Sequence, residues 1–354
     1  MDRCLFTLKM LHLNLQHMID FRSDTFTKPS AGMLQTMFQA EVGDDVFGED
    51  PTVNKLESVA AELFGMESAI FCPSGTMTNQ IAIKCHTQPG DEVICDKLSH
   101  IYIYEGGGIA FNSGSSVKPL EGTFGQITSK MVENAINPDD IHKPVSRLVS
   151  LENTANRGGG SCYHFEEIKA IKEICIKNEL SLHLDGARLF NAIVAKNETP
   201  IQYGNIFDSI SICLSKGLGT PVGSLLLGKK DFIKKARRFR KVFGGGMRQA
   251  GILAAAGIYA LDNNINRLAI DHKHAKVIAD ALRKKDFIKD IFPVETNIII
   301  FEVGGRYTAT QFVELLQQQN IKTISISDNQ VRMVLHLDIT EAMIDKTITT
   351  IEKL

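Results

Sequence analysis

Short apolar segments alternate with helix-like segments through most of the chain, and this alternation limits the folds that the chain can adopt. Between residues 53 and 64, apolar side chains recur at the spacing of an α-helix. The predicted strands lie at 68–72, 92–95, 147–151, 180–184, 209–214 and 223–227. Short buried strands that alternate with helices are typical of a mostly parallel sheet with helices on both faces. We therefore expect the α/β fold class.

The last third of the chain predicts a second, smaller domain. An alanine-rich helix is expected at 251–261, and 265–282 continues it as a long connecting helix. Two strand-like segments then flank one more helix, at 297–302, 309–318 and 330–336. A chain of 354 residues also exceeds the usual size of one domain. The expected parts are an N-terminal extension outside the fold at 1–17, a large domain at 18–255 and a small C-terminal domain with its connecting helix at 256–354.

Composition and charge exclude several classes of function. The formal net charge of −2, from 39 basic and 41 acidic residues, gives no electrostatic footprint for nucleic acid. No apolar run is long enough to span a membrane, and polar residues interrupt the apolar stretch of 1–17 that could suggest a signal peptide. Seven cysteines without a CxxC pair or zinc-like spacing indicate reduced thiols in a cytoplasmic protein.

One basic cluster, at 234–241, is the exception to this even charge distribution. A patch for RNA or for a membrane is one interpretation of the cluster. A solvated helix face, or cations gathered around a small anion, is the plainer interpretation. We expect neither a nucleic acid nor a membrane as a partner.

Three features at the ends of predicted strands indicate a functional site: an acid, a lysine and a turn that could bind an anion. Asp185 ends an apolar strand, where an acid either caps a turn or binds a ligand. Lys216 follows another apolar strand and precedes a glycine-rich turn, so we expect it to be at least partly buried. A buried amine becomes a nucleophile toward carbonyl groups. At Ser74–Gly75–Thr76, a strand-to-helix turn offers backbone N–H groups and a helix dipole, which together favour a phosphate.

These three features together describe one cofactor, pyridoxal 5′-phosphate (PLP). Ligands of open α/β sheets bind at the carboxyl ends of the strands, so the three features are expected to share one site. PLP needs a lysine for covalent attachment, a carboxylate against its pyridine nitrogen and an anion site for its phosphate. Lys216, Asp185 and the turn at 74–76 supply these groups.

Almost the whole sequence, from Ile19 to near the C-terminus, resembles the low-specificity L-threonine aldolases, which are fold-type I PLP enzymes. The resemblance rests on five segments: 20–25 (DFRSDT), 42–48 (VGDDVFG), 183–188 (HLDGAR), 213–223 (CLSKGLGTPVG) and 244–249 (GGGMRQ). It implies a large domain with a mostly parallel central sheet and a small C-terminal α/β domain.

The resemblance also implies the roles of the residues that bind the cofactor. Lys216 is similar to the lysine that forms the Schiff base, and Asp185 to the partner of the pyridine nitrogen. Gly75 and Thr76 are similar to the phosphate ligands. His100 is similar to the histidine that stacks on the ring, although a lone histidine at a strand end would otherwise be taken as structural.

Further residues are implied to bind the substrate or to complete the cofactor site. Ser23, Arg188 and Arg332 resemble the groups that hold the substrate carboxylate, and Arg188 also belongs to the cofactor-binding set. Without the resemblance, Arg332 would be interpreted as a solvent-facing residue of an apolar strand. Arg248 resembles an arginine that reaches the phosphate of a neighbouring subunit. His142 corresponds to a histidine that some members place near the substrate hydroxyl.

The implied activity is retro-aldol cleavage of L-threonine or L-allo-threonine to glycine and acetaldehyde, through an aldimine on Lys216. The base that removes the β-hydroxyl proton stays open between His100, His142, Lys216 and a bound water. Another PLP reaction on the same scaffold, β-elimination or racemisation, is the alternative. A regulator that has lost catalysis is disfavoured because Lys216, Asp185 and Arg332 are all present.

The implied partner is a small β-hydroxy-α-amino acid, and no metal is expected. The family also implies a homodimer or homotetramer with shared active sites, for which Arg248 and the loop at 43–48 are the candidate cross-subunit residues. Two positions depart from the family pattern. Phe47 stands where many members have tyrosine, so a hydroxyl contact from that side is missing. Ala155 stands where a histidine is common, so the preference between threonine isomers is expected to differ here.

Overall fold

The computed structural model describes residues 18–354, which form two compact units. The larger unit comprises 27–269, and the smaller unit combines the described residues up to Phe26 with 270–354. The sequence predicted a boundary at 255, whereas the contacts divide the chain fourteen residues later and assign 18–26 to the smaller unit. The extension expected at 1–17 lies outside the described residues.

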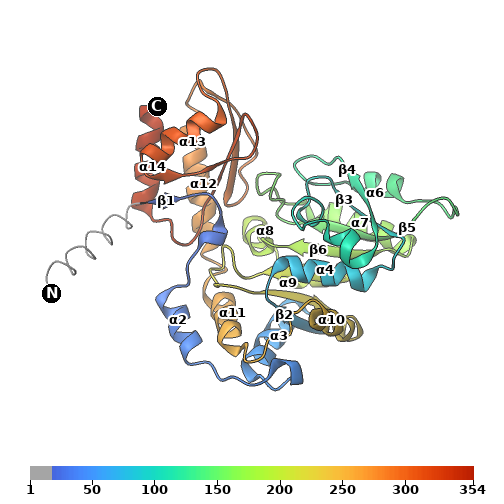
Figure 1. Cartoon of the computed structure of the whole chain (residues 1–354). Coiled ribbons are helices and arrows are strands. Elements are labelled where there is room, and N and C mark those ends of the chain that lie inside the picture. The colour runs from blue at the N-terminus through green and yellow to red at the C-terminus, as the bar shows by residue number, and fades with distance from the viewer. Residues whose placement is uncertain (1–17) are drawn as a thin grey trace. The chain divides into compact units, whose positions relative to one another are not determined.

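A seven-stranded sheet forms the centre of the larger unit, in the order β2-β8-β7-β6-β5-β3-β4 (Figure 1). Its strands are β2 (Ser68–Cys72), β3 (Asp91–Asp96), β4 (Ser116–Leu120), β5 (Val145–Glu152), β6 (Ser181–Gly186), β7 (Ser209–Cys213) and β8 (Ser224–Gly228). Only β8 runs antiparallel to its neighbours in this sheet, which confirms the predicted mostly parallel α/β arrangement.

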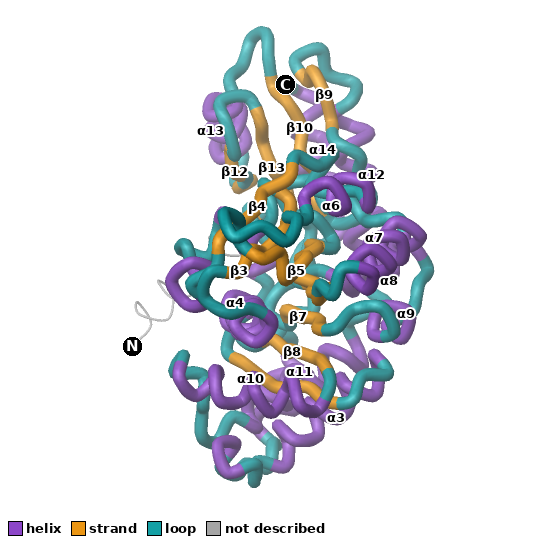
Figure 2. Tube along the Cα trace, turned by 90° about the vertical axis from the view of Figure 1, so that its right-hand side faces the viewer, coloured by secondary structure: helices purple, strands orange, loops and turns teal. Residues whose placement is uncertain are grey.

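Helices cover both faces of this sheet, with α4 on one side of the strands and α7 and α8 on the other (Figure 2). The α-helices are α2 (Ala31–Phe38), α3 (Pro51–Phe64), α4 (Gly75–His86), α5 (His100–Ile103), α6 (Ser129–Ala135), α7 (Phe165–Lys177), α8 (Leu189–Lys196), α9 (Pro200–Gly204), α10 (Lys230–Val242) and α11 (Gly251–Asn263). Every second residue of a strand faces the same side. Leu182, Leu184, Ile210 and Ile212 of β6 and β7 accordingly belong to one buried apolar core.

The smaller unit contains two further sheets. In one, β1 (Ile19–Asp20) runs parallel to β11 (Ile321–Lys322). The other has the order β12-β13-β10-β9 and is antiparallel, with β9 (Ile288–Ile291), β10 (Ile298–Val303), β12 (Ile324–Ser325) and β13 (Gln330–Val334). Its helices include α13 (Ala309–Gln318) and α14 (Glu341–Lys353). No helix among the described residues is both long and apolar enough to cross a membrane.

The long connecting helix predicted from 251 to 282 is interrupted. Helix α11 ends at Asn263, and α12 (Leu268–Leu282) begins after a short break. At the break, the buried Asn264 donates its side-chain amide to the backbone oxygen of Leu218 at 2.8 Å. An asparagine that binds a loop in this way favours a helix end over helix continuation.

Asp50 connects three segments of the larger unit, and we expect its loss to destabilise the fold. The buried carboxylate accepts hydrogen bonds from the backbone N–H groups of Thr52, Val53, Gly43 and Gly251 at 2.8–3.2 Å. Asp50→Ala removes the N-cap of α3 and leaves further amides without partners, which should lower the free energy of unfolding by about 2–4 kcal/mol. Urea unfolding followed by circular dichroism measures this, with Asp50→Asn as the milder control. A change within about 0.5 kcal/mol would contradict the assignment.

Candidate active site

The carboxyl ends of the parallel strands place two acids side by side. Asp185 of β6 lies opposite Glu152 of β5 in the strand register. Both side chains are buried. One carboxylate oxygen of Asp185 accepts from the backbone N–H of Ala187 at 3.1 Å, and the other accepts from the side-chain amide of Asn79 at 2.9 Å. The orientation of the Asp185 carboxylate is therefore fixed by the turn after its own strand and by helix α4.

Lys216 lies three residues beyond the end of β7, in the loop 214–223 between β7 and β8. The backbone oxygen of Lys216 accepts from the N–H of Gly219 at 2.8 Å, and Gly219 has a φ of 80°, a value that favours glycine. The lysine is half-buried and lines a small pocket together with Arg188 and Cys213. The structure therefore brings Lys216 and Arg188 to one pocket, as the sequence predicted for one site.

The turn at Ser74–Thr76 begins helix α4. Ser74 caps the helix by accepting from the N–H of Met77 at 3.2 Å, and the N–H groups of Gly75 and Thr76 lie in the first turn of α4, where a helix offers them no internal partner. A Cβ atom added at Gly75 would lie 3.9 Å from the Cβ of Cys213, so this turn and the end of β7 are neighbours. The free amides at the start of a helix form a binding site for an anion such as a phosphate.

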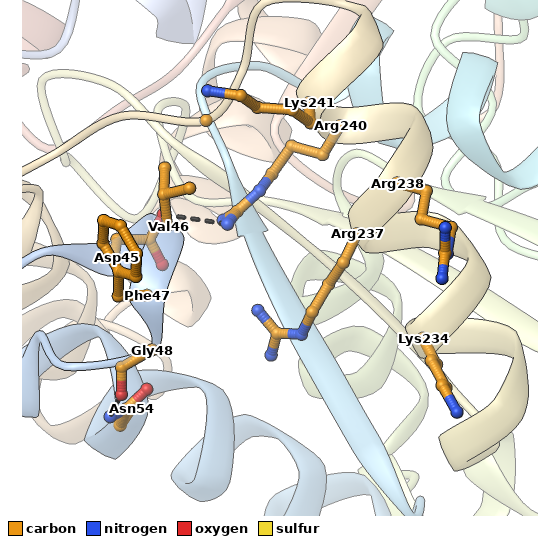
Figure 3. A pocket seen from close by; sticks show the side chains of 11 residues that line it. Asp45, Val46, Phe47, Gly48, Asn54, Lys234, Arg237, Arg238, Arg240 and Lys241 are labelled. Carbon is orange, nitrogen blue, oxygen red and sulfur yellow. Dashed lines mark hydrogen bonds and ion pairs between the residues drawn. The ribbon is translucent and has the colours of Figure 1, made fainter.

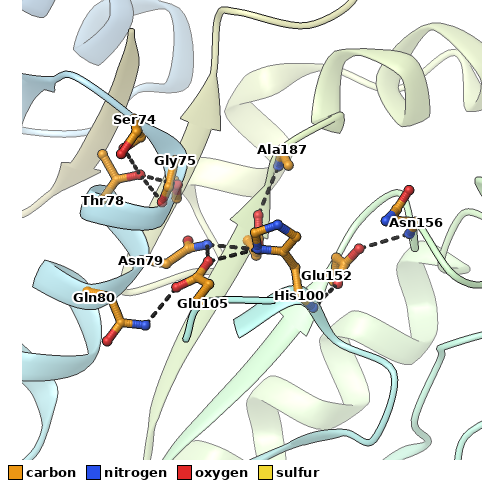
Figure 4. A network of polar contacts seen from close by, with 12 residues as sticks. Ser74, Gly75, Thr78, Asn79, Gln80, His100, Glu105, Glu152, Asn156 and Ala187 are labelled. Atoms are coloured by element: carbon orange, nitrogen blue, oxygen red, sulfur yellow. Dashed lines mark hydrogen bonds and ion pairs between the residues drawn. The ribbon is translucent and has the colours of Figure 1, made fainter. Parts of the chain in front are cut away.

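A network of polar side chains surrounds His100 on the same edge of the sheet (Figure 4). His100 Nδ1 lies 2.9 Å from a carboxylate oxygen of the buried Glu105. Asn79 and Gln80 of α4 also donate to Glu105, at 2.9 and 2.6 Å. Burial disfavours a charged imidazole, but the hydrogen bond to Glu105 and the charge of Asp185 outweigh it and raise the pKa of His100 above its usual value.

A compact cluster is formed by His100, Glu105 and Asp185. One ring nitrogen of the histidine and one carboxylate oxygen of each acid all lie within 4.8 Å of one another. The side-chain nitrogen of Asn79 donates to both carboxylates of this cluster. These carboxylates are therefore held by protein N–H groups, and the arrangement presents an imidazole beside two acids.

Glu152 is a residue of the site that the sequence analysis missed. Its two oxygens accept from the backbone N–H groups of His100 at 2.7 Å and Asn156 at 2.8 Å. Arg188 Nη1 in turn donates to the side-chain oxygen of Asn156, at 3.5 Å. Burial, with a further contribution from the charge of Asp185, raises the pKa of Glu152 to about 7. An acid at the end of an apolar strand, the signal that identified Asp185, is also present at Glu152.

His142 does not lie beside the other candidates, and the structure corrects this prediction for the single subunit. It precedes the first residue of β5, whereas Glu152 ends that strand. The eight residues of β5 place the start of the strand about 23 Å from Glu152. His142 is exposed, and its Nδ1 pairs with Asp140 at 2.9 Å. Within one subunit, His142 therefore lies near the opposite edge of the sheet from Glu152 and Asp185.

Three other candidates are placed outside this cluster. Ser23 and Arg332 belong to the smaller unit, where Arg332 Nη2 donates to the backbone oxygen of Arg22 at 3.1 Å. Arg248 is exposed, and it pairs with Asp44 at 2.8 Å. The two predicted cross-subunit elements, Arg248 and the loop at 43–48, therefore contact one another in the chain.

The basic cluster of the sequence lines a separate cavity of about 780 Å³, beside helix α10 (Figure 3). Five cations line it, namely Lys234, Arg237, Arg238, Arg240 and Lys241. Arg237 forms an ion pair with the buried Glu57, and the buried Arg240 forms one with Asp45 at 2.9 Å. Part of the cluster is therefore neutralised within the fold, and the remaining cations lie on an exposed helix face.

Comparison with known proteins identifies the family. Residues 20–305 match the beta-eliminating lyase family, so the chain belongs to this class of lyases. The chain is 46% identical over 323 residues to the low specificity L-threonine aldolase of Escherichia coli K12, covering 91% of this chain and 95% of that protein. It is 41% identical to a probable low-specificity L-threonine aldolase 2 of Arabidopsis thaliana, covering 95% and 97%. The chain belongs to the low-specificity L-threonine aldolase family, as the resemblance predicted.

A solved structure supports the fold at lower sequence identity. The threonine aldolase of Leishmania major superposes with a TM-score of 0.83 at 22% identity, covering 95% of this chain and 99% of that chain. This likeness concerns the fold alone.

Proposed function

We propose that the protein binds PLP in the larger unit and cleaves the Cα–Cβ bond of β-hydroxy-α-amino acids. L-Threonine and L-allo-threonine then give glycine and acetaldehyde. The observation that carries the proposal is the placement of Lys216, Asp185 and the turn at Gly75 on one edge of one sheet. The names of the relatives, low-specificity L-threonine aldolases, support the same substrate class.

The residues present fit the cofactor. Lys216 supplies the amine for covalent attachment, and the anchored carboxylate of Asp185 suits a protonated ring nitrogen. The amides of Gly75 and Thr76 suit the phosphate, and the buried hydroxyl of Ser224 beside Gly75 has no partner among the described residues. When bound, the cofactor supplies a conjugated ring that accepts the electron pair of the broken bond.

The side chains of this protein then bind, orient and deprotonate the substrate. The guanidinium of Arg188, oriented by Asn156, suits a carboxylate, and Ser23 and Arg332 are proposed as further carboxylate ligands. A fixed carboxylate selects which Cα bond lies perpendicular to the cofactor ring, so orientation selects the reaction. Within the larger unit, His100 and Lys216 are the candidates for the group that takes the β-hydroxyl proton.

We also propose that the enzyme is cytoplasmic and works as a homodimer or homotetramer. The exposed Arg248 and the half-buried Asp44 form an ion pair that links the two segments expected at a subunit interface. The six cysteines among the described residues are free thiols, which suits a reducing compartment. Activity that stays unchanged in a monomer at high dilution would contradict a shared active site.

A product assay tests the proposed reaction. The purified protein, loaded with PLP, is expected to convert L-threonine, L-allo-threonine and L-phenylserine into glycine and the corresponding aldehyde in equal amounts. Substrates are discriminated by interactions made in the transition state, so kcat/KM is compared across the three. Glycine and aldehyde are measured together with 2-oxo acid, ammonia and D-amino acids.

The same assay separates the second candidate function, β-elimination, which the matched family description favours. β-Elimination of threonine yields 2-oxobutanoate and ammonia, and racemisation yields a D-amino acid. A 2-oxo acid as the main product would overturn the proposed cleavage and leave the cofactor assignment intact. Absence of any turnover by protein that contains bound PLP would overturn the proposed function as a whole.

A further inference from the structure

A continuous hydrogen-bonded chain runs behind Asp185, between helix α4 and strands β6 and β7. His86 Nε2 lies 2.8 Å from the hydroxyl of Ser209, which lies 2.8 Å from His183 Nδ1. His183 Nε2 lies 3.3 Å from the side-chain oxygen of Asn79. The nitrogen of Asn79 reaches Asp185 at 2.9 Å. Asn79 and His183 are buried, as is Ser209.

The direction of each hydrogen bond follows from chemistry, beginning at the carboxylates. The amide nitrogen of Asn79 donates to both Asp185 and Glu105, because an ionised carboxylate can only accept. A flipped amide would place its oxygen against two carboxylate oxygens. The oxygen of Asn79 therefore faces His183, and His183 Nε2 carries the hydrogen.

The remaining directions are fixed by the neutrality of the two histidines. Burial lowers the pKa of His183 to about 3 and the pKa of His86 to about 4. A neutral His183 with hydrogen on Nε2 has an acceptor at Nδ1, so Ser209 donates its hydroxyl hydrogen to it. The oxygen of Ser209 is then left to accept from Nε2 of His86.

We propose that Asn79 and His183 are positioning residues for Asp185: the chain from His86 orients the Asn79 amide so that its two N–H bonds hold the carboxylates of Asp185 and Glu105 in place. Each donated hydrogen bond fixes the direction of one carboxylate oxygen. Asp185 is then directed at the ring nitrogen, and Glu105 at His100. The inference rests on the proposed function, because it assigns Asp185 to the cofactor.

The first test uses wild-type protein without cofactor and does not depend on catalysis. Nitrogen-15 NMR of the histidine side chains is expected to show His183 neutral, with its hydrogen on Nε2, throughout pH 5.5–8, a window above its pKa of about 3. Assignment of the signal uses its loss in His183→Gln. A hydrogen on Nδ1 of His183, or a charged ring at pH 7, would overturn the proposed direction of the chain.

The second test compares variants of the loaded enzyme. Asn79→Leu removes both donors and is expected to weaken PLP binding and lower kcat by about 10- to 100-fold, the range for losing charge-assisted hydrogen bonds to buried carboxylates. His183→Leu should lower the PLP affinity and kcat by about tenfold each. His183→Gln keeps an N–H near the position of Nε2 and is expected to restore most of the loss. KM should change less than kcat, since neither residue is proposed to contact the substrate.

A matched control separates positioning from packing. Thr87 ends helix α4 at the opposite end from Gly75, and its buried hydroxyl donates to the backbone oxygen of Ile83 at 2.7 Å. Thr87→Val removes this one buried hydrogen bond and is expected to leave PLP affinity and the pH dependence of the cofactor absorbance unchanged. In His183→Leu, that pH dependence should shift.

The outcomes distinguish this inference from the proposed function. Wild-type protein that binds no PLP would remove the proposed function. Wild-type protein that binds PLP and cleaves substrate, with Asn79→Leu and His183→Leu giving the same PLP affinity, absorbance and kcat, would overturn only the positioning role. If His183→Leu and His183→Gln lost the same PLP affinity and kcat, the glutamine would not have rescued the chain, and the positioning role would also be overturned.

Discussion

Lys216→Ala is expected to abolish covalent attachment of PLP and to lower kcat by at least about 10³-fold, the scale for loss of a covalent nucleophile. The long-wavelength absorbance of lysine-bound PLP should disappear, although the phosphate turn at Gly75 still binds free PLP weakly. Borohydride reduction of wild-type protein should attach the cofactor to the peptide that contains Lys216, which peptide mass spectrometry identifies.

Two comparison variants make this result specific. Lys216→Arg keeps a positive charge but cannot form the covalent bond, so it should be as inactive as the alanine variant. Lys241→Ala removes a lysine from the separate basic cavity and should leave the absorbance and kcat unchanged. Labelling of a peptide without Lys216, or a normal absorbance in Lys216→Ala, would remove this residue from its proposed role.

Asp185→Asn is expected to give the second largest loss, with kcat reduced by about 10²-fold or more. The substitution preserves the volume of the side chain at the end of β6 but removes the charge that favours a protonated ring nitrogen. The ring is then a weaker acceptor for the electrons of the broken bond. Steady-state kinetics, PLP affinity and the cofactor absorbance measure the effect.

The environment of Asp185 also predicts how its variants differ. Asp185→Ala should lose more PLP affinity than Asp185→Asn, because it leaves the buried donor of Asn79 with one fewer acceptor. Circular dichroism and the unfolding midpoint serve to verify that the variants are folded. A folded Asp185→Asn enzyme with kcat within about twofold of wild type would exclude the pairing with the ring nitrogen.

Strands and helices with strong local patterns could be predicted from the sequence, whereas elements with weak patterns could not. The central strands are short apolar runs because helices cover both of their faces, so β5, β6 and β7 are visible in the sequence. The edge strand β4, Ser116–Leu120, has no buried residue, contains a proline and has no such pattern. The break between α11 and α12 was missed because Asn264 ends the helix through a contact with a distant loop.

The candidate site divides in a similar way. Asp185, Lys216 and the turn at Gly75 could be found because each directly follows a predicted strand. Asn79 and Glu105 acquire their importance only from contacts between segments far apart in the chain, which no local pattern reveals. The alternating polar residues Ser209 and Ser211, in a strand buried on both faces, were a signal of the polar interface.

The polar face of β6 and β7 has a consequence for how helix α4 can sit on the sheet. A wholly apolar interface tolerates small rotations of a helix about its axis, since one methyl group replaces another at little cost. Here Thr78 and His86 must each meet a serine of β7. A rotated or displaced α4 would leave several buried polar atoms without hydrogen-bond partners at once. The polar interface of α4 with β6 and β7 thus fixes where the first amides of α4 lie relative to the sheet. It thereby also fixes the distance from a bound phosphate to Lys216.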